Sequence, residues 1–397
     1  MHDHQAIVLI SFLILAFGIF SKLSERSPIS GPMVFVSVGM LVSLMGSFEL
    51  HAETGFVKFV AELTLIIILF VDGSLIKVSR LKNVFTGIPA RLLLIGLPLT
   101  AILGVLVALW IFPDWGIWSI LLLAFILTPT DAALGQAVVK SEDVPEDLRQ
   151  SISIESGLND GIILPPIFVC IAILASGSNE LSGEGEWLKY ITLQLTLGPL
   201  IGALIGHFGG RLVDYACSRD WMDPNYQRLS AIALAILTFA IAELFHGNGF
   251  IAAFVAGLAL GVKSPEVRHR IQEFGEAQGQ LLSLSIFLIL GIMAIPTFSP
   301  YWGMDSFVYA ILSLTVIRML PVLLSLIGTG LDNYSKIFIG WFGPRGIASI
   351  LYLLIVIGDL GATGYEKVLS VIVLTVFISV FVHGLTAVVM SKQFRKK

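Results

Sequence analysis

The amino-acid sequence predicts an all-α polytopic membrane protein of thirteen transmembrane helices, with inverted repeats and two crossed, interrupted helices. The first observation is composition, because the 397 residues are 56% hydrophobic and only 13% charged, whereas soluble domains carry about 25% charged residues. The second is that the apolar residues form runs, several of which reach the roughly 20 residues that a helix needs to cross a bilayer. The third is that two of these runs contain proline and a charged residue close together.

Polar connections, proline and glycine divide the chain into the expected spans. In chain order, the thirteen spans cover residues 5–23, 29–46, 56–78, 84–111, 116–139, 151–175, 188–213, 226–246, 249–262, 278–295, 306–327, 335–358 and 365–390. The first run is expected to be retained, because its cations Lys22 and Arg26 follow it, whereas those of a signal peptide precede it.

The distribution of Lys and Arg orients the chain, because cytoplasmic connections carry an excess of these residues. With the N-terminus outside and the C-terminus in the cytoplasm, the inner connections hold most of the 24 Lys and Arg, including Lys77, Arg80, Lys82 and Lys140. The outer connections hold only Lys58, Lys189 and Lys367. The sequence therefore predicts one multi-pass domain over residues 1–397 in the cell (inner) membrane, with no soluble domain.

The fifth and twelfth spans are expected to be interrupted. The fifth contains LTPTDAAL, with Pro129 and Asp131, and the twelfth contains FGPRGIAS, with Pro344 and Arg345. Proline removes a backbone hydrogen bond and clashes with the preceding turn, so each helix should unwind there. Spans seven apart run in opposite directions, which is the pattern of an inverted repeat with a site near the middle of the membrane.

The charges at the two interruptions are expected to neutralise helix ends. Where two interrupted antiparallel helices cross, two positive helix N-termini meet on one side and two negative C-termini on the other. Asp131 is placed to offset the positive ends and Arg345 the negative ends. The alternative is an accidental proline kink with a charge that extends to the membrane surface.

The sixth span carries the most polar motif of the chain, ESGLND at residues 155–160. Residues four apart share a helix face, which groups Glu155 with Asn159 and Ser156 with Asp160. Charged side chains in the membrane are costly and usually functional. We expect the oxygens of Asp160, Ser156, Thr130 and Asp131 to bind a hard cation. A polar contact that only holds helices together is the structural alternative.

Asp160 is the residue expected to carry exchange. A poorly solvated carboxylate binds a proton more readily than one in water, so Asp160 should hold either a proton or a cation. Competition for one site, combined with alternating access, is sufficient for antiport. Glu155 is expected to pair with the buried Arg345, whereas Arg318 is expected to extend toward the inner membrane surface. One exchangeable charge then remains, which predicts electroneutral exchange of one cation for one proton.

Two further acids lie in the third span. Asp72 is expected about one turn above the inner connection, where it can gather cations. Glu62 is expected near the outer end of the span, in the interfacial region. The sequence favours Asp72 over Glu62 as a contributor to the site.

These motifs together resemble the NhaP-type sodium/proton antiporters, which are related to the animal sodium/proton exchangers. The resemblance is carried by ILFVDG (68–73), TPTDAAL (128–134), ESGLND (155–160) and FGPRG (342–346). It implies that Asp160 is the exchanged carboxylate beside Asn159, that Ser156, Thr130, Asp131 and Asp72 contribute to the cation site, and that Glu155 and Arg345 form a bracing pair. The order Asn159–Asp160 is similar to the Asn-Asp pair of the electroneutral branch of this family. The TPTDAAL motif departs from the commoner Thr-Asp-Pro order.

The resemblance also implies a homodimer, with core helices within residues 84–175 and 306–390 and dimerisation or scaffold helices in the remainder. The expected transported species are protons and a monovalent cation, with sodium first and lithium or potassium as alternatives, for pH and cation homeostasis. No cofactor, enzymatic activity or nucleic-acid partner is expected. Two other functions stay open, namely an intramembrane aspartyl protease using Asp131 and Asp160, and a passive cation channel.

Overall fold

The computed structural model describes residues 2–25, 27–45, 55–76, 87–131, 134, 136–139, 141–176 and 184–395. All regular elements within these ranges are helical, which confirms the all-α class. The chain divides into two compact units. The first unit comprises residues 1–58, 86–159 and 283–397, and the second comprises residues 59–85 and 160–282. Lys77, Arg80, Lys82 and Lys140, which help to orient the predicted topology, lie outside the described residues.

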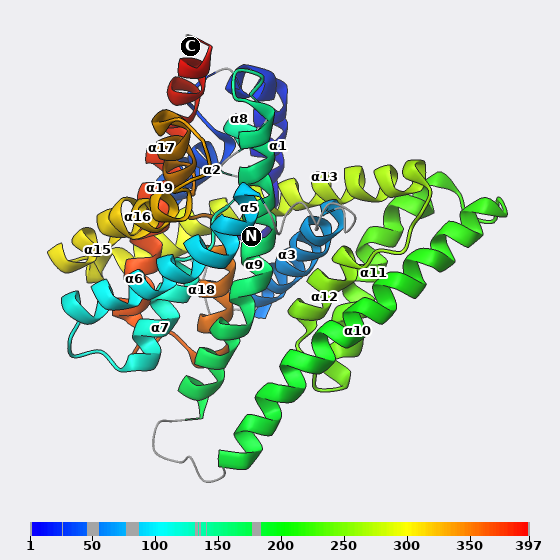
Figure 1. The fold of residues 1–397 in the computed structure, drawn as a ribbon, viewed down its shortest axis with the longest axis horizontal. Coiled ribbons are helices and arrows are strands. Elements are labelled where there is room, and N and C mark those ends of the chain that lie inside the picture. Colours follow the sequence, from blue (N-terminus) through cyan, green and yellow to red (C-terminus); the bar gives the residue numbers. More distant parts are fainter. Residues whose placement is uncertain are drawn as a thin grey trace. The chain divides into compact units, whose positions relative to one another are not determined.

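The first unit holds the two predicted interruptions, and its helices α6, α7, α15, α16, α18 and α19 pack against one another (Figure 1). Helix α9 starts in this unit, and α13 ends in it. Its α-helices are α1 (His2–Glu25), α2 (Gly31–Leu44), α5 (Ile88–Arg91), α6 (Leu97–Ile111), α7 (Ile117–Ile126), α8 (Gln136–Val139), the first half of α9 (Glu146–Ala175), the end of α13 (Pro265–Ile289), α14 (Ile295–Phe298), α15 (Met304–Leu314), α16 (Val316–Ser325), α17 (Asn333–Trp341), α18 (Ile347–Leu360) and α19 (Glu366–Phe394).

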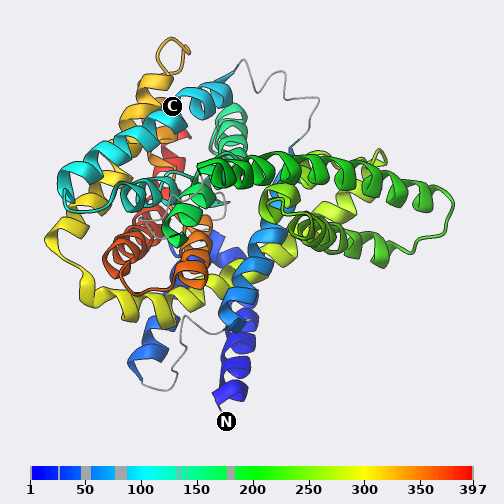
Figure 2. The same ribbon diagram turned by 90° about the horizontal axis from the view of Figure 1, so that it is seen from below.

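The second unit is built around three helices that lie side by side in both views (Figures 1 and 2). They are α10 (Glu184–Ser218), α11 (Pro224–Leu244) and α12 (Gly249–Leu258). The same unit contains most of α3 (Gly55–Leu75), the second half of α9 and most of α13. Helix α10 approaches α12 closely because it presents a row of glycines, and a Cβ on Gly202 or Gly206 would overlap the backbone of α12.

Both interruptions predicted from proline are found. Helix α7 ends at Ile126, residues 127–131 are not helical, and helix resumes at Gln136. Helix α17 ends at Trp341 and α18 begins at Ile347, which leaves residues 342–346 unwound. The eleventh span, predicted over 306–327, is found at Met304–Ser325, and its helix is interrupted at Thr315 (φ −111°, ψ −91°) between α15 and α16.

Two prolines change the winding of a helix without ending it. Residues Leu92–Gly96 form a π-helical turn two residues before Pro98, and Leu290–Ala294 form another two residues before Pro296. Proline has no N–H and therefore cannot donate a backbone hydrogen bond to the carbonyl four residues earlier. The wider π-helical turn shifts the neighbouring backbone hydrogen bonds and so accommodates this loss. Ile88–Ile111 and Pro265–Tyr301 therefore remain continuous enough to act as spans.

Among the described residues, seven helices are long and apolar enough to cross a membrane. Five shorter apolar helices accompany them, including α7 and α18, the long pieces of the two interrupted spans. The protein is thus a multi-pass helical membrane protein. The helix that contains the tenth predicted span begins before residue 278, because α13 starts at Pro265 and carries the charged stretch as helix.

Candidate functional site

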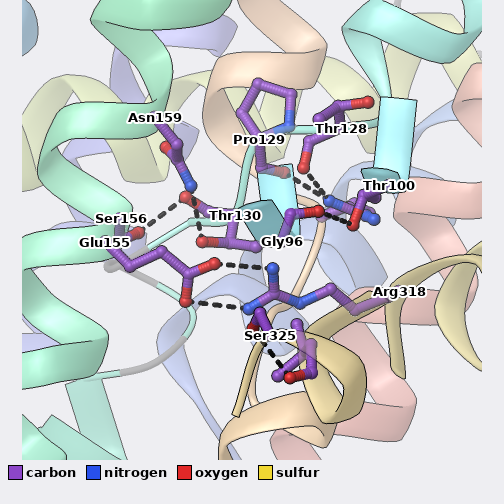
Figure 3. A network of polar contacts seen from close by, with 12 residues as sticks. Gly96, Thr100, Thr128, Pro129, Thr130, Glu155, Ser156, Asn159, Arg318 and Ser325 are labelled. Atoms are coloured by element: carbon purple, nitrogen blue, oxygen red, sulfur yellow. Dashed lines mark hydrogen bonds and ion pairs between the residues drawn. The ribbon is translucent and has the colours of Figure 1, made fainter. Parts of the chain in front are cut away.

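One face of α9 is fixed to the unwound segment that follows α7. The Ser156 hydroxyl donates to the backbone oxygen of Thr130 at 2.6 Å, and the Asn159 amide nitrogen donates to the Thr130 hydroxyl at 2.7 Å (Figure 3). All three side chains are buried, and Asn159 is 0% exposed. The structure therefore brings together Ser156, Asn159 and Thr130, as the sequence predicts.

Asp160 directly follows Asn159 on α9 and is buried, with 7% of its surface exposed. Its position near the middle of the 30-residue helix places it far from either helix end. Asp72 and Glu62 on α3 are both half-buried. The ligand roles of Asp160 and Asp72 rest on these positions and on the sequence.

Glu155 pairs with Arg318, and this corrects the predicted pair between Glu155 and Arg345. Nη1 and Nη2 of Arg318 donate to the two carboxylate oxygens of Glu155 at 2.6 and 2.8 Å (Figure 3). Both side chains are 1% exposed, so Arg318 does not extend toward the membrane surface. Such a bidentate pair is among the strongest hydrogen-bonded arrangements of charged groups.

Two features of the folded chain explain why Arg318, and not Arg345, is the partner of Glu155. Helix α16 starts anew at Val316, and Arg318 faces inward at its first turn. Gly343 in the FGPRG motif supplies the room, because a Cβ at this position would overlap the guanidinium of Arg318. The glycine beside Pro344 was the signal that a large side chain packs there, but the sequence does not say which one.

The Arg345 side chain binds the C-terminal end of α7. This agrees with the expectation that Arg345 offsets the partial negative charge of the helix C-termini. Its Nη1 donates to the backbone oxygens of Thr128 and Pro129, the latter at 2.9 Å. These carbonyls follow the last turn of α7, in the non-helical segment over residues 127–131. Arg345 is 0% exposed. A fixed positive charge thus lies where the helix dipole is negative.

Asp131 binds the start of α18, as predicted for the positive helix ends. Its Oδ2 accepts a hydrogen bond from the backbone N–H of Ile347 at 2.6 Å. The backbone N–H of Asp131 in turn donates to the carbonyl of Pro344 at 2.8 Å. The two unwound segments therefore contact each other directly, and each supplies the charge that the other's helix end requires.

Gly346 is required by this contact, and Gly346→Ala is the first prediction. A Cβ on Gly346 would overlap the Oδ2 atom of Asp131, so the bond to Ile347 should be lost. We expect destabilisation of roughly 1.5–3 kcal/mol, the worth of a hydrogen bond to a charged group, together with slower ion exchange. Thermal unfolding in detergent and transport in liposomes measure the two effects.

Gly116→Ala is the matched control, because a Cβ at this N-cap of α7 meets nothing within 4 Å. It should leave stability and transport close to wild type. Equal behaviour of the two alanine variants would contradict the assigned role of Gly346.

Comparison with known proteins agrees with this description. The sequence model of a family described as "Sodium/hydrogen exchanger, transmembrane" matches residues 8–393. The chain is 28% identical to the K(+)/H(+) antiporter NhaP of Alkalimonas amylolytica over 88% of this chain and 60% of that relative. It is 26% identical to the K(+)/H(+) antiporter NhaP2 of Shewanella baltica over 95% of this chain and 64% of that relative. The chain thus spans less than two thirds of the length of these relatives.

A solved structure has a similar fold. The sodium proton antiporter MjNhaP1 from Methanocaldococcus jannaschii superimposes with a TM-score of 0.76 at 17% identity, covering 100% of both chains. Fold and site define a multi-pass helical membrane protein in which two unwound segments meet around buried charges. The match over residues 8–393 shows the particular family: the chain belongs to the sodium/hydrogen exchanger family.

Proposed function

We propose that the protein is a secondary active antiporter that exchanges a monovalent cation for a proton across the cell membrane by alternating access. The observation that carries this proposal is the buried polar network between α9 and the unwound segment after α7, in a chain of the sodium/hydrogen exchanger family. Unwound backbone at membrane depth is tolerated only inside protein or along a watery cavity. The family to which the chain belongs consists of sodium/hydrogen exchangers, which are transporters rather than enzymes.

The proposed exchange site has Asp160 as its titrating carboxylate, takes neutral and charged oxygens from Asn159, Ser156, Thr130 and Asp131, and has Asp72 as a further contributor. Oδ1 of Asn159 is buried and accepts no hydrogen bond from any residue that the structure describes. The amide group of Asn159 is held by its nitrogen on Thr130, which leaves this oxygen as a neutral ligand beside the Asp160 carboxylate. A hard monovalent cation is bound by such a mixture of charged and neutral oxygens.

The proposed stoichiometry follows from the charges that are already neutralised. Glu155 and Arg318 form a closed pair. Asp131 and Arg345 have opposite charges, and each is bound to the end of an interrupted helix. Of the three buried acids among the described residues, Asp131, Glu155 and Asp160, only Asp160 then remains to change its occupant during the cycle. The charge argument for electroneutral exchange of one cation for one proton therefore holds with Arg318 in place of Arg345 as the partner of Glu155.

The proposed architecture is thirteen spans in an inverted repeat, with the interrupted fifth and twelfth spans crossing. Two close helix contacts support the repeat. Gly39 on α2 lies against Gly291, and Gly73 on α3 lies against α12 at Gly257. The first contact joins the second and tenth spans, and the second contact joins the third and ninth spans. A repeat offset by seven spans relates the second span to the ninth and the third to the tenth, so it relates these two contacts to each other. We further propose a homodimer in the inner membrane, with the N-terminus outside and the C-terminus in the cytoplasm.

The second prediction is that the purified wild-type protein in liposomes exchanges protons for Na⁺, Li⁺ or K⁺ without net charge movement. Imposing a membrane potential with a potassium-selective ionophore, or short-circuiting it, should leave the initial rate of Na⁺/H⁺ or Li⁺/H⁺ exchange unchanged. The dependence of the rate on the concentration of each cation ranks the three. A current that accompanies turnover would contradict the one-for-one stoichiometry, and the absence of exchange with all three cations would contradict the proposed function.

A further inference from the structure

Helix α19 presents a row of polar side chains toward the break between α17 and α18. Ser379, His383 and Thr386 are spaced four and three residues apart, which places them on one face of the helix. Ser379 and His383 are 0% and 1% exposed. Neither the exchange proposal nor the neutralised helix ends uses this row.

Ser379 binds the unwound backbone directly. Its hydroxyl oxygen accepts a hydrogen bond from the backbone N–H of Arg345 at 2.7 Å. Arg345 is the fourth of the five unwound residues, so its N–H has no helical acceptor. A buried backbone N–H without a partner is costly, and Ser379 therefore determines where this peptide group lies.

The same row binds the other edge of the break. Trp341, the last residue of α17, donates from Nε1 to the Thr386 hydroxyl at 2.9 Å. Its ring lies 5.1 Å from the ring of His383, at an interplanar angle of 35°. Nδ1 of His383 is 3.1 Å from the Ser379 hydroxyl oxygen. Nδ1 also lies 3.1 Å from the backbone oxygen of Ser379, so the ring of His383 is held against both oxygens of Ser379.

We propose that Ser379 is a positioning residue for ion exchange, with His383 orienting its hydroxyl. By holding the Arg345 peptide, Ser379 sets the position from which the guanidinium reaches the carbonyls of Thr128 and Pro129. The inference rests on the proposed exchange function. It adds that α19 controls the geometry of the break without contacting the transported ion.

The test compares two isosteric variants, Ser379→Thr and Ser379→Val, in liposomes. The pair has the same branched shape and differs by the hydroxyl, so packing is matched. We expect Ser379→Thr to retain exchange and Ser379→Val to exchange about tenfold more slowly, because an orphaned buried N–H shifts the break. Ser370→Ala is the matched control, since Ser370 is also 0% exposed on α19 and, among the described residues, its hydroxyl bonds only to the backbone oxygen of Lys367 on the same helix.

The outcomes separate this inference from the proposed function. Equal rates for the Thr and Val variants, in a protein whose wild type exchanges ions, would overturn the role of Ser379. Failure of the wild type to exchange would overturn the proposed function instead. If Ser379→Val is not recovered from the membrane, His383→Asn and His383→Leu take its place. Asn keeps a hydrogen-bonding group near the position of Nδ1 and should retain exchange, Leu should exchange more slowly, and equal rates would again overturn the inference.

Discussion

Asp160→Asn should abolish exchange of cations for protons in liposomes. The substitution keeps the size of the side chain but removes the only group proposed to change between a proton and a cation. Asn has no titratable proton at any pH, so raising the pH or the cation concentration should not restore transport. The measurement is the rate of proton movement driven by a cation gradient, compared with wild type at several pH values.

Asp147→Asn is the matched control for this experiment. Asp147 lies on the same helix, in the exposed first turn of α9, and its substitution removes the same charge without touching the proposed site. This variant should transport at the wild-type rate. Normal exchange by Asp160→Asn would refute the assignment of the exchange site to α9.

Arg318→Gln should strongly destabilise the folded protein. It leaves the Glu155 carboxylate buried at 1% exposure without its partner. Breaking a buried pair by removing one member costs about 3–5 kcal/mol, because an uncompensated charge remains. We expect a clearly lower apparent melting temperature in detergent and a lower yield from the membrane.

Two companion variants identify the cause of this loss. The double variant Glu155→Gln with Arg318→Gln removes both charges and should recover much of the lost stability, which a double-mutant cycle measures. Lys367→Gln breaks an exposed pair, in which Lys367 and Asp305 are 2.9 Å apart and 34% and 40% exposed. Such pairs contribute about 0–1 kcal/mol. If Arg318→Gln were no more damaging than Lys367→Gln, the bracing role of the buried pair would be wrong.

The sequence predicted the two interruptions because their causes are local. Pro129 and Pro344 each break the helix in which they occur, and the nearby charges Asp131 and Arg345 bind helix ends whose dipoles are equally local properties. The contact of Ser156 and Asn159 with Thr130 was also predictable, because a polar face on an apolar helix needs polar partners. These parts of the site follow from residue type and spacing.

The partner of Glu155 could not be predicted in the same way. Arg318 reaches Glu155 because the chain breaks at Thr315, where the sequence has no proline or glycine, and because Gly343 leaves room for the guanidinium. Both are features of packing between segments far apart in sequence. Ser379 was missed for a related reason, since a serine in a long apolar helix looks like many others until the peptide that it binds is in place.

The end of a membrane span and the end of a helix are also different properties. The stretch from residue 265 to 277 is charged, and hydropathy therefore places the tenth span after it. Charged residues with good helix propensity continue a helix into water, and α13 accordingly starts at Pro265. Hydropathy locates the bilayer, whereas caps and prolines locate the helix ends.

The most direct test of the central claim is the number of protons released when the purified protein binds a cation. In weakly buffered detergent solution, near the pH at which exchange is half-maximal, saturating cation should displace protons from wild type, because a carboxylate must lose its proton to become a ligand. Asp160→Asn should release none. Cation binding to wild type without proton release, or equal release by Asp160→Asn, would contradict competition for a single carboxylate on α9.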